Sequence, residues 1–212
     1  AEHGRLAAAF PALARGEPAG PAPLGAVAAA LGDAAGRAKL VAGLVGRGIA
    51  ASRTPGMHEA EGARLGLGYA YRLLDFDRMG LADGDLAGVV AACRGQGLAG
   101  LNVTHPFKEA VIPLLDGLAP EAGAIGAVNT VVFSAAGRAT GHNTDAFGFA
   151  ESFRRELAGV PLGEVVLIGA GGGGMAVAHA LLGLGTASLR VVDTAPAKAA
   201  GLVAKLAALH PG

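Results

Sequence analysis

Apolar residues follow two patterns along this 212-residue chain. Short continuous runs of Val, Leu and Ile, bounded by Gly, Asp or Asn, are typical of buried strands. They predict strands over residues 40–45, 69–75, 100–103, 127–133, 138–140, 164–168 and 189–193. Longer Ala-rich or amphipathic stretches predict helices over residues 24–39, 55–65, 86–96, 108–115, 145–157, 175–184 and 197–209.

The alternation of these strands and helices predicts an α/β fold with mostly parallel sheets. After residue 163 the order is strand, glycine-rich turn, helix, strand and helix, which predicts the first half of a doubly wound, Rossmann-type domain. Four prolines lie between Pro11 and Pro23, in a segment rich in Ala and Gly. We interpret residues 1–38 as an N-terminal extension.

Charge and cysteine content exclude several classes of protein. The 17 basic and 17 acidic side chains balance, so we expect neither nucleic acid nor an acidic membrane surface as a partner. Cys93 is the single cysteine, which allows no disulfide framework, and no secretion signal is recognisable at the N-terminus. We therefore expect a cytoplasmic protein. Residues 165–189 lack charge, but four consecutive glycines make a membrane span there improbable.

The glycine-rich turn has the spacing G-x-G-x-x-G at the end of a predicted strand. In a dinucleotide site the first glycine permits the tight turn, the second admits the pyrophosphate, and the third lets helix and strand pack closely. The predicted cofactor-binding residues here are Gly169, Ala170, Gly171, Gly172, Gly173 and Gly174. In so glycine-rich a protein, a purely structural turn is the alternative.

Asp193 ends the next predicted strand, where an acidic side chain can accept hydrogen bonds from both ribose hydroxyls of NAD. The same carboxylate would repel the 2′-phosphate of NADP, so NAD is the expected cofactor. Lys198 lies close enough in sequence to keep NADP open. The alternative for Asp193 is a helix N-cap.

Lys108 and Asp145 form a candidate catalytic pair, because a dehydrogenase must take a hydroxyl proton as the hydride leaves. The alternatives are a solvated helix residue for Lys108 and an N-cap for Asp145. The histidines lack metal-ligand spacing, so no metal is expected. Tyr71, Phe107 and Phe147 are interpreted as packing groups.

Four motifs occur in order along the chain: Asn102-Val103-Thr104-x-Pro106-x-Lys108, Gly126-Ala127-Val128-Asn129-Thr130, Asn143-Thr144-Asp145 and Gly169-x-Gly171-Gly172. Their order and spacing resemble those of shikimate dehydrogenases, from about residue 40 to residue 209. The resemblance implies reversible oxidation of shikimate at its C3 hydroxyl, with Lys108 as the acid/base and Asp145 as its partner. It assigns residues 39–147 to a substrate-binding catalytic domain and residues 148–212 to the first half of an NAD(P)-binding Rossmann domain.

The resemblance also implies the substrate contacts. Two hydroxyl side chains after the first strand would hold the substrate carboxylate, and the remaining residues would contact the ring hydroxyls or the reacting group. The implied substrate-binding residues are Ser52, Thr54, Asn102, Thr104, Lys108, Asn129 and Asp145.

Departures from the common pattern point to a subtype. Ser52-Arg53-Thr54 stands where the usual NADP-dependent enzyme has Ser-x-Ser, and Val192-Asp193-Thr194 stands where that enzyme has Asn-Arg-Thr. His105 and Gly141-His142-Asn143 also resemble the NAD-preferring quinate/shikimate dehydrogenase branch. We therefore expect quinate to be oxidised to 3-dehydroquinate as well.

Two other functions stay open: an NADP-linked biosynthetic shikimate dehydrogenase, and a non-catalytic sensor of quinate or shikimate. The expected partner is a small-molecule substrate, and the chain is expected to be a monomer or a homodimer. Family members continue past the first half of the cofactor domain. We therefore expect a complete substrate domain joined to half a cofactor domain, with little activity by itself.

Overall fold

The computed structural model describes residues 21–32 and 40–210, which divide into two units. Unit 1 contains the described residues up to Leu118 together with Thr130–Gly141. Unit 2 contains Ala119–Asn129 and the described residues from His142 onward. Most of the predicted N-terminal extension, residues 1–20 and 33–38, lies outside the described residues.

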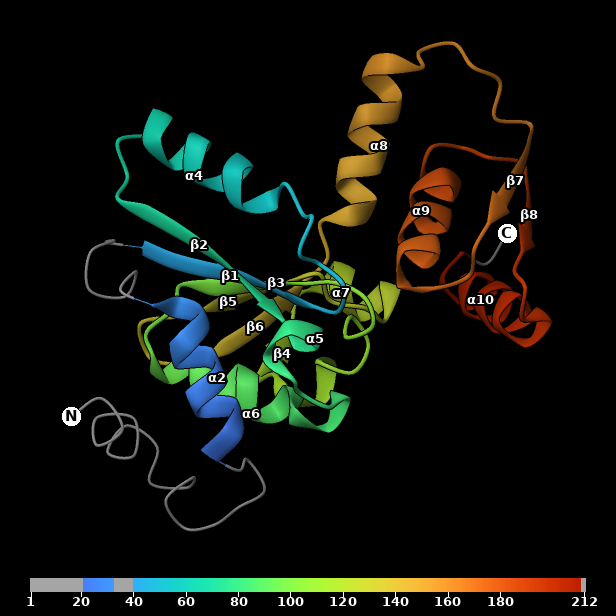
Figure 1. Ribbon diagram of the computed structural model, residues 1–212. Coiled ribbons are helices and arrows are strands. Elements are labelled where there is room, and N and C mark those ends of the chain that lie inside the picture. The colour runs from blue at the N-terminus through green and yellow to red at the C-terminus, as the bar shows by residue number, and fades with distance from the viewer. Residues whose placement is uncertain (1–20, 33–39, 211–212) are drawn as a thin grey trace. The chain divides into compact units, whose positions relative to one another are not determined.

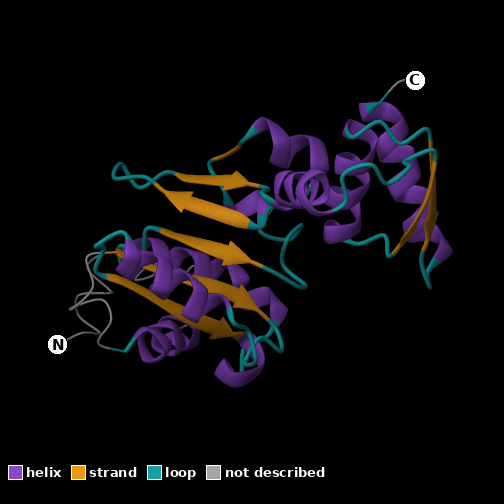
Figure 2. Cartoon of the chain, turned by 90° about the horizontal axis from the view of Figure 1, so that it is seen from above, coloured by secondary structure: helices purple, strands orange, loops and turns teal. Residues whose placement is uncertain are grey.

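A six-stranded sheet with the strand order β2-β1-β3-β5-β6-β4 forms the centre of unit 1 (Figure 1). Its strands are β1 (Leu40–Gly46), β2 (Tyr69–Asp75), β3 (Gly100–Val103), β4 (Gly117–Leu118), β5 (Thr130–Phe133) and β6 (Ala139–His142). β1 pairs in parallel with β2 and β3, β4 pairs in parallel with β6, and β3 pairs antiparallel with β5. The predicted α/β fold with mostly parallel strands is confirmed, and Figure 2 shows these strands together in orange.

Helices cover both faces of this sheet. In Figure 1, α4 (Thr54–Arg64) lies on one side, and α2 (Pro21–Leu31) and α6 (Leu86–Gly95) lie on the other. Val27 and Leu31 of α2 are buried, so the range interpreted as an extension includes a helix that contributes to the core. β1 is buried on both of its faces from Val41 to Gly46, whereas in β3 the buried Leu101 and Val103 alternate with less buried residues, as the period of two in a strand requires.

Unit 2 is built on a βαβ element. β7 (Glu164–Ile168) leads into α9 (Gly172–Gly183), and β8 (Ser188–Val192) returns parallel to β7 and leads into α10 (Pro196–Leu209). α7 (Pro120–Ile125) and α8 (Asp145–Glu156) complete the unit. Its core consists of buried residues from α7, α9, α10 and the loop after α7: Ile125, Ala127, Met175, Ala176, Ala178, Leu202 and Leu206.

The β7–β8 sheet is covered on one face only. Leu167, Leu189 and Val191 pack against the core of unit 2. Val166 and Ile168 point to the other face and are 61% and 83% exposed. Within the described residues this is the expected first half of a Rossmann-type fold, because a doubly wound sheet has helices on both faces.

One predicted helix is wrong. Residues 108–115 form turns followed by the short 3₁₀ helix Ile112–Leu114. Pro113 has no N–H to donate and would collide with the preceding turn of an α-helix. The backbone donors on either side instead reach back three residues, from Ile112 to Glu109 and from Leu114 to Val111.

Other element boundaries also differ from the sequence pattern. α2 begins at Pro21 and ends at Leu31, before Gly32 with its positive φ, whereas the pattern predicts residues 24–39. α9 begins at Gly172, three residues before its predicted start. β5 begins at Thr130 rather than at residue 127. The short elements α5 (Phe76–Met79), α7, β4 and the 3₁₀ turn Asp83–Asp85 are not predicted from the sequence.

The uncharged stretch 165–189 is divided among β7, the glycine turn, α9, the turn after it and the start of β8. Within residues 21–32 and 40–210, no helix has the length and apolar character that crossing a bilayer requires.

Candidate active site

The two predicted carboxylate-binding hydroxyls meet at the start of α4. Ser52 donates a hydrogen bond from Oγ to Thr54 Oγ1 over 2.9 Å, and its Oγ accepts from Thr54 N over 3.2 Å. Thr54 is the first residue of α4, whose N-terminus offers unpaired backbone N–H groups and a partial positive charge. The arrangement suits an anion, as the sequence pattern predicts.

Asp75, which the sequence pattern does not single out, fixes the loop that leads to these hydroxyls. This carboxylate ends β2, is 3% exposed, and accepts from the N–H groups of Gly48, Ile49 and Asp77 over 3.0–3.2 Å. A buried carboxylate is costly unless it is hydrogen-bonded, and three donors compensate this one. Asp75 therefore holds the start of the loop against the carboxyl end of β2.

Arg47 ties the same loop to the segment that follows β2. Its guanidinium donates to Asp77 and Asp83 over 2.6 Å each and to the carbonyl oxygen of Leu81 over 2.8 Å. No local sequence pattern indicates this contact, because the partners of Arg47 lie 30 to 36 residues away.

Asn102 lies on β3, and Thr104 and Lys108 follow it in a tight turn. Thr104 N donates to Val45 O over 2.9 Å, and Phe107 N donates to Thr104 O over 2.8 Å. Phe107 is 1% exposed and packs against Phe76, with ring centroids 4.5 Å apart. The buried Phe107 thus anchors the turn that presents Lys108, which is half-buried. The interpretation of Phe107 as a packing group is confirmed.

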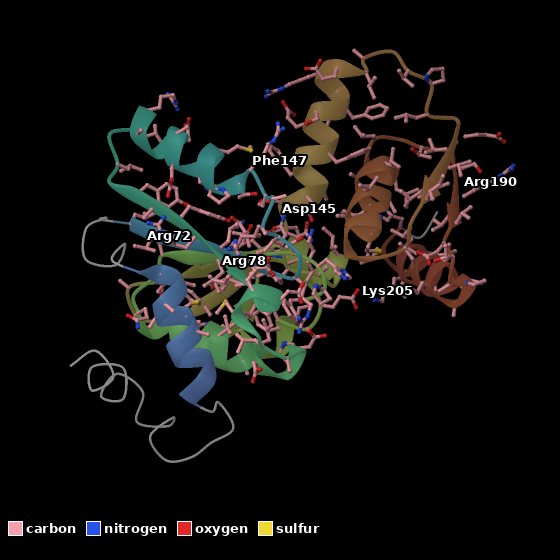
Figure 3. The ribbon with its side chains drawn as sticks, in the orientation of Figure 1. Arg72, Arg78, Asp145, Phe147, Arg190 and Lys205 are labelled. Carbon is pink, nitrogen blue, oxygen red and sulfur yellow. The ribbon has the colours of Figure 1, made fainter. Side chains whose placement is uncertain are left out.

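Asp145, labelled in Figure 3, begins α8, and its carboxylate is held by Asn129. Asn129 Nδ2 donates to Asp145 Oδ1 over 2.7 Å and to Thr144 Oγ1 over 2.9 Å, while Asn129 Oδ1 accepts from Thr144 N over 3.0 Å. Asn129 is itself buried. The two predicted substrate residues of this unit are therefore in direct contact.

Asn143 is a further positioning group beside Asp145. It is 2% exposed, accepts from Asp145 N over 3.0 Å, and donates to Ala127 O over 2.9 Å. The first turn of α8 is thereby tied to the loop before β5. Phe147, two residues further along the same helix, is 71% exposed (Figure 3), so its interpretation as a packing group is wrong within this unit.

Ser52, Thr54, Asn102, Thr104 and Lys108 belong to unit 1, whereas Asn129 and Asp145 belong to unit 2. The pairing of Lys108 with Asp145 therefore stays a prediction.

The glycine turn has the close approach that its spacing predicts. Gly169 has φ +105°, a conformation that side-chain-bearing residues rarely adopt. A Cβ on Gly174 would lie far inside contact distance of the Gly169 carbonyl. A Cβ on Gly171 would meet no atom within 4 Å, which leaves space beside the N-terminus of α9. These features fit the diphosphate of a dinucleotide.

Asp193 contacts this turn directly. Its Oδ2 accepts from Ala170 N and its Oδ1 accepts from Ala195 N, both over 2.8 Å. Hydrogen bonds from Ala195 and Ala170 lower the pKa of the Asp193 carboxyl below its usual value. α10 begins at Pro196 with Ala195 as its N-cap, so Asp193 is not the helix N-cap that was the alternative.

In the part of the chain that the structure describes, no group of three or more His, Cys, Asp or Glu side chains could hold a metal ion.

Comparison with known proteins identifies the family. Residues 44–131 match the model of the shikimate dehydrogenase substrate binding domain. The chain is 55% identical over 164 residues to a shikimate dehydrogenase (NADP(+)) of Streptomyces avermitilis, a match that covers 77% of this chain and 56% of that relative. The chain belongs to the shikimate dehydrogenase family. It is also 45% identical over 163 residues to a quinate/shikimate dehydrogenase (NAD(+)) of Corynebacterium efficiens, covering 77% of this chain and 57% of the relative.

Solved structures of shikimate dehydrogenase family members superpose on the fold of this chain. The quinate dehydrogenase of Corynebacterium glutamicum in complex with NAD superposes with a TM-score of 0.76 at 43% identity, covering 80% of this chain and 60% of that one. The Thermus thermophilus shikimate 5-dehydrogenase in complex with NADP(H) and shikimate gives a TM-score of 0.68 at 38% identity, covering 78% and 60%. The chain thus spans less than two thirds of each of these relatives.

Proposed function

We propose that the protein is a nicotinamide-dependent dehydrogenase that reversibly oxidises shikimate at its C3 hydroxyl to 3-dehydroshikimate. One observation carries the proposal. The stretch matched to the substrate binding domain, residues 44–131, contains every predicted substrate-binding residue except Asp145. Asp145 follows it at the start of α8, hydrogen-bonded to Asn129 within that stretch.

The chemistry follows from the side chains. When a nicotinamide cofactor is bound, it supplies the acceptor for the hydride that leaves the alcohol carbon. Lys108 takes the hydroxyl proton during oxidation and returns it during reduction, as a general base and acid. Asp145, whose carboxylate and backbone are both fixed by asparagine side chains, orients the hydroxyl and Lys108. The Ser52–Thr54 pair at the N-terminus of α4 binds the substrate carboxylate.

The finer proposal is that NAD is preferred and that quinate is a second substrate. Asp193 supports NAD, because its carboxylate lies at the glycine turn, where a ribose 2′-phosphate would meet like charge. Quinate carries a hydroxyl beside its carboxylate, so Thr54 is placed to affect this choice. The second candidate is an enzyme linked to NADP and shikimate alone, which the name of the 55% identical Streptomyces relative favours.

Steady-state kinetics of the intact gene product with shikimate and quinate, each with NAD⁺ and NADP⁺, separate these candidates. We expect oxidation of both acids, with higher kcat/KM for NAD⁺. A clear preference for NADP⁺ without quinate oxidation would support the second candidate. Binding of either acid without turnover would point to the sensor function.

Replacement of Lys108 tests the acid/base role. In Lys108→Ala, shikimate still binds, because the other contacts remain, while kcat falls by roughly 10²- to 10⁴-fold. Kinetics and calorimetric titration with shikimate measure the two effects separately. Lys205→Ala, which removes a lysine charge at an exposed position of α10, is the control. Unchanged turnover in Lys108→Ala would refute the role.

A further inference from the structure

Tyr71 is a buried tyrosine whose hydroxyl has a polar partner, so filling space in the core does not account for all of its contacts. It lies on β2 and is 2% exposed. Its hydroxyl donates a hydrogen bond of 2.6 Å to Oδ1 of Asn102, on β3. Burial raises the pKa of Tyr71 well above its ordinary value, so the hydroxyl stays protonated at neutral pH.

The sheet register explains how Tyr71 reaches a strand that is not its neighbour. β1 lies between β2 and β3; Tyr71 is opposite Ala42 of β1, and Asn102 is opposite Leu44. Residues 42 and 44 point to the same face of β1, so Tyr71 and Asn102 share that face. The small side chain of Ala42 lets the tyrosine ring extend across β1 to the carboxamide.

The carboxamide of Asn102 is held from two sides. Oδ1 accepts from Tyr71, and Nδ2 donates to Thr130 Oγ1 over 3.1 Å. Asn102 and Thr130 are register partners of β3 and β5. In this orientation Oδ1 faces Tyr71 and Nδ2 faces Thr130. Rotation of the amide by 180° would require both hydroxyls to exchange their donor and acceptor roles.

The ring of Tyr71 packs against α4, the helix that carries Thr54. His58 stacks on Tyr71 with ring centroids 4.4 Å apart and an interplanar angle of 19°. His58 lies four residues after Thr54 in α4, so the two share one helix face. Glu59 of the same helix accepts from Tyr71 N over 2.9 Å and from Arg72, on β2 (Figure 3), over 3.0 Å. Tyr71 thus joins two predicted substrate-binding segments.

We propose that Tyr71 is a positioning residue that orients the Asn102 carboxamide for a hydroxyl of the substrate. The proposal rests on the proposed function, because Asn102 is a predicted substrate contact. Tyr71 does not itself touch the substrate; it selects the donor and acceptor pattern that Asn102 presents.

Tyr71→Phe tests the proposal, because it keeps the ring and its stacking on His58 and removes only the hydroxyl. We expect the Kd for shikimate to rise roughly three- to tenfold, as for the loss of one oriented hydrogen bond, while the Kd for NAD⁺ is unchanged. Tyr69→Phe is the matched control: it removes a tyrosine hydroxyl on the same strand, two residues before Tyr71, whose hydrogen-bond partner is His58 Nδ1 at 3.2 Å.

A double-mutant cycle separates positioning from general stability. In the Asn102→Ala background, Tyr71→Phe is expected to cause no further loss of shikimate affinity, because no carboxamide remains to be oriented. Full additivity of the two losses, or equal losses in Tyr71→Phe and Tyr69→Phe, would overturn the proposal.

Nuclear magnetic resonance gives a readout without ligand. The Asn102 side-chain NH₂ signals, assigned by their absence in Asn102→Ala, are expected to shift in Tyr71→Phe and to stay in place in Tyr69→Phe. If the unmodified protein binds neither shikimate nor quinate, the proposed function fails, and these signals still decide the orienting contact. Signals that do not move in Tyr71→Phe would exclude it.

Discussion

At the scale of single residues, the candidate site depends on polar side chains that bind backbone groups. Asp75 accepts from two N–H groups of the loop before α4 and one of α5, and Asn143 joins Asp145 N to Ala127 O. Asp193 joins the glycine turn to the loop after β8. Each contact satisfies donors that irregular backbone would otherwise leave unpaired, so these residues set the geometry of their neighbours.

The pKa of the Asp193 carboxyl should lie measurably below that of an aspartate in an unfolded chain. Its folded pKa lies below the unfolded value of about 3.9, so its contribution to stability is present above that value and is lost as pH falls through the folded pKa. We expect the turn contacts to persist at neutral pH and to weaken only in acid. Carbon-detected titration of the carboxyl, assigned with Asp193→Asn, measures this.

A short peptide with the sequence of residues 191–196 provides the reference for that titration. A carboxyl pKa in the folded protein equal to or above the peptide value would contradict the contacts to Ala170 and Ala195.

At the scale of elements, the sequence pattern predicts most of the regular structure. Strands 69–75, 100–103 and 164–168 have the predicted bounds, because each is a local run of residues that suit a buried strand. The missed elements are short or depend on partners elsewhere: β4 has two residues and forms only by pairing with β6, and α7 has six. Local pattern does not encode such pairing.

The β7–turn–α9 element makes a direct prediction through Gly174. In Gly174→Ala the new methyl group collides with the Gly169 carbonyl, which pushes the start of α9 away from β7. We expect a loss of roughly 1–3 kcal/mol in the free energy of unfolding of unit 2 and weaker cofactor binding. Urea unfolding followed by circular dichroism and titration with NAD⁺ measure both effects.

Gly183→Ala is the control, because a Cβ at this position near the end of α9 meets no atom within 4 Å. It should be neutral or slightly stabilising. Equal destabilisation by both substitutions would contradict the close approach at Gly169 as the cause, because alanine is the better helix former at both positions and only a Cβ at residue 174 meets that carbonyl.

At the scale of the whole molecule, the chain passes between the units more than once. Residues 119–129 belong to unit 2, residues 130–141 return to unit 1, and the chain enters unit 2 again at His142. The sequence pattern instead places one boundary after residue 147. The reason for the difference is the core of unit 2, in which Ile125 and Ala127 pack with residues of α9 and α10.

Cys93 offers a readout for the folding of unit 1. It is the single cysteine of the chain, lies on α6 with no exposed surface, and its pKa is raised by burial. Because the thiolate is the reactive form, we expect no modification by a thiol reagent in the native protein. Modification should rise with urea in parallel with unfolding of unit 1. A native labelling rate equal to that of a peptide with residues 88–98 would contradict this burial.

The sequence by itself determined the α/β fold, the βαβ glycine turn and the family, because these depend on local periodicity and on motifs of fixed spacing. It also identified Ser52 with Thr54 as neighbours, since one residue separates them. Only the tertiary structure revealed the supports of the site. Tyr71 meets Asn102 across 31 residues of sequence, and Asp75 meets Gly48 across 27. Such pairs form only when the register of the sheet aligns them, which no local pattern specifies.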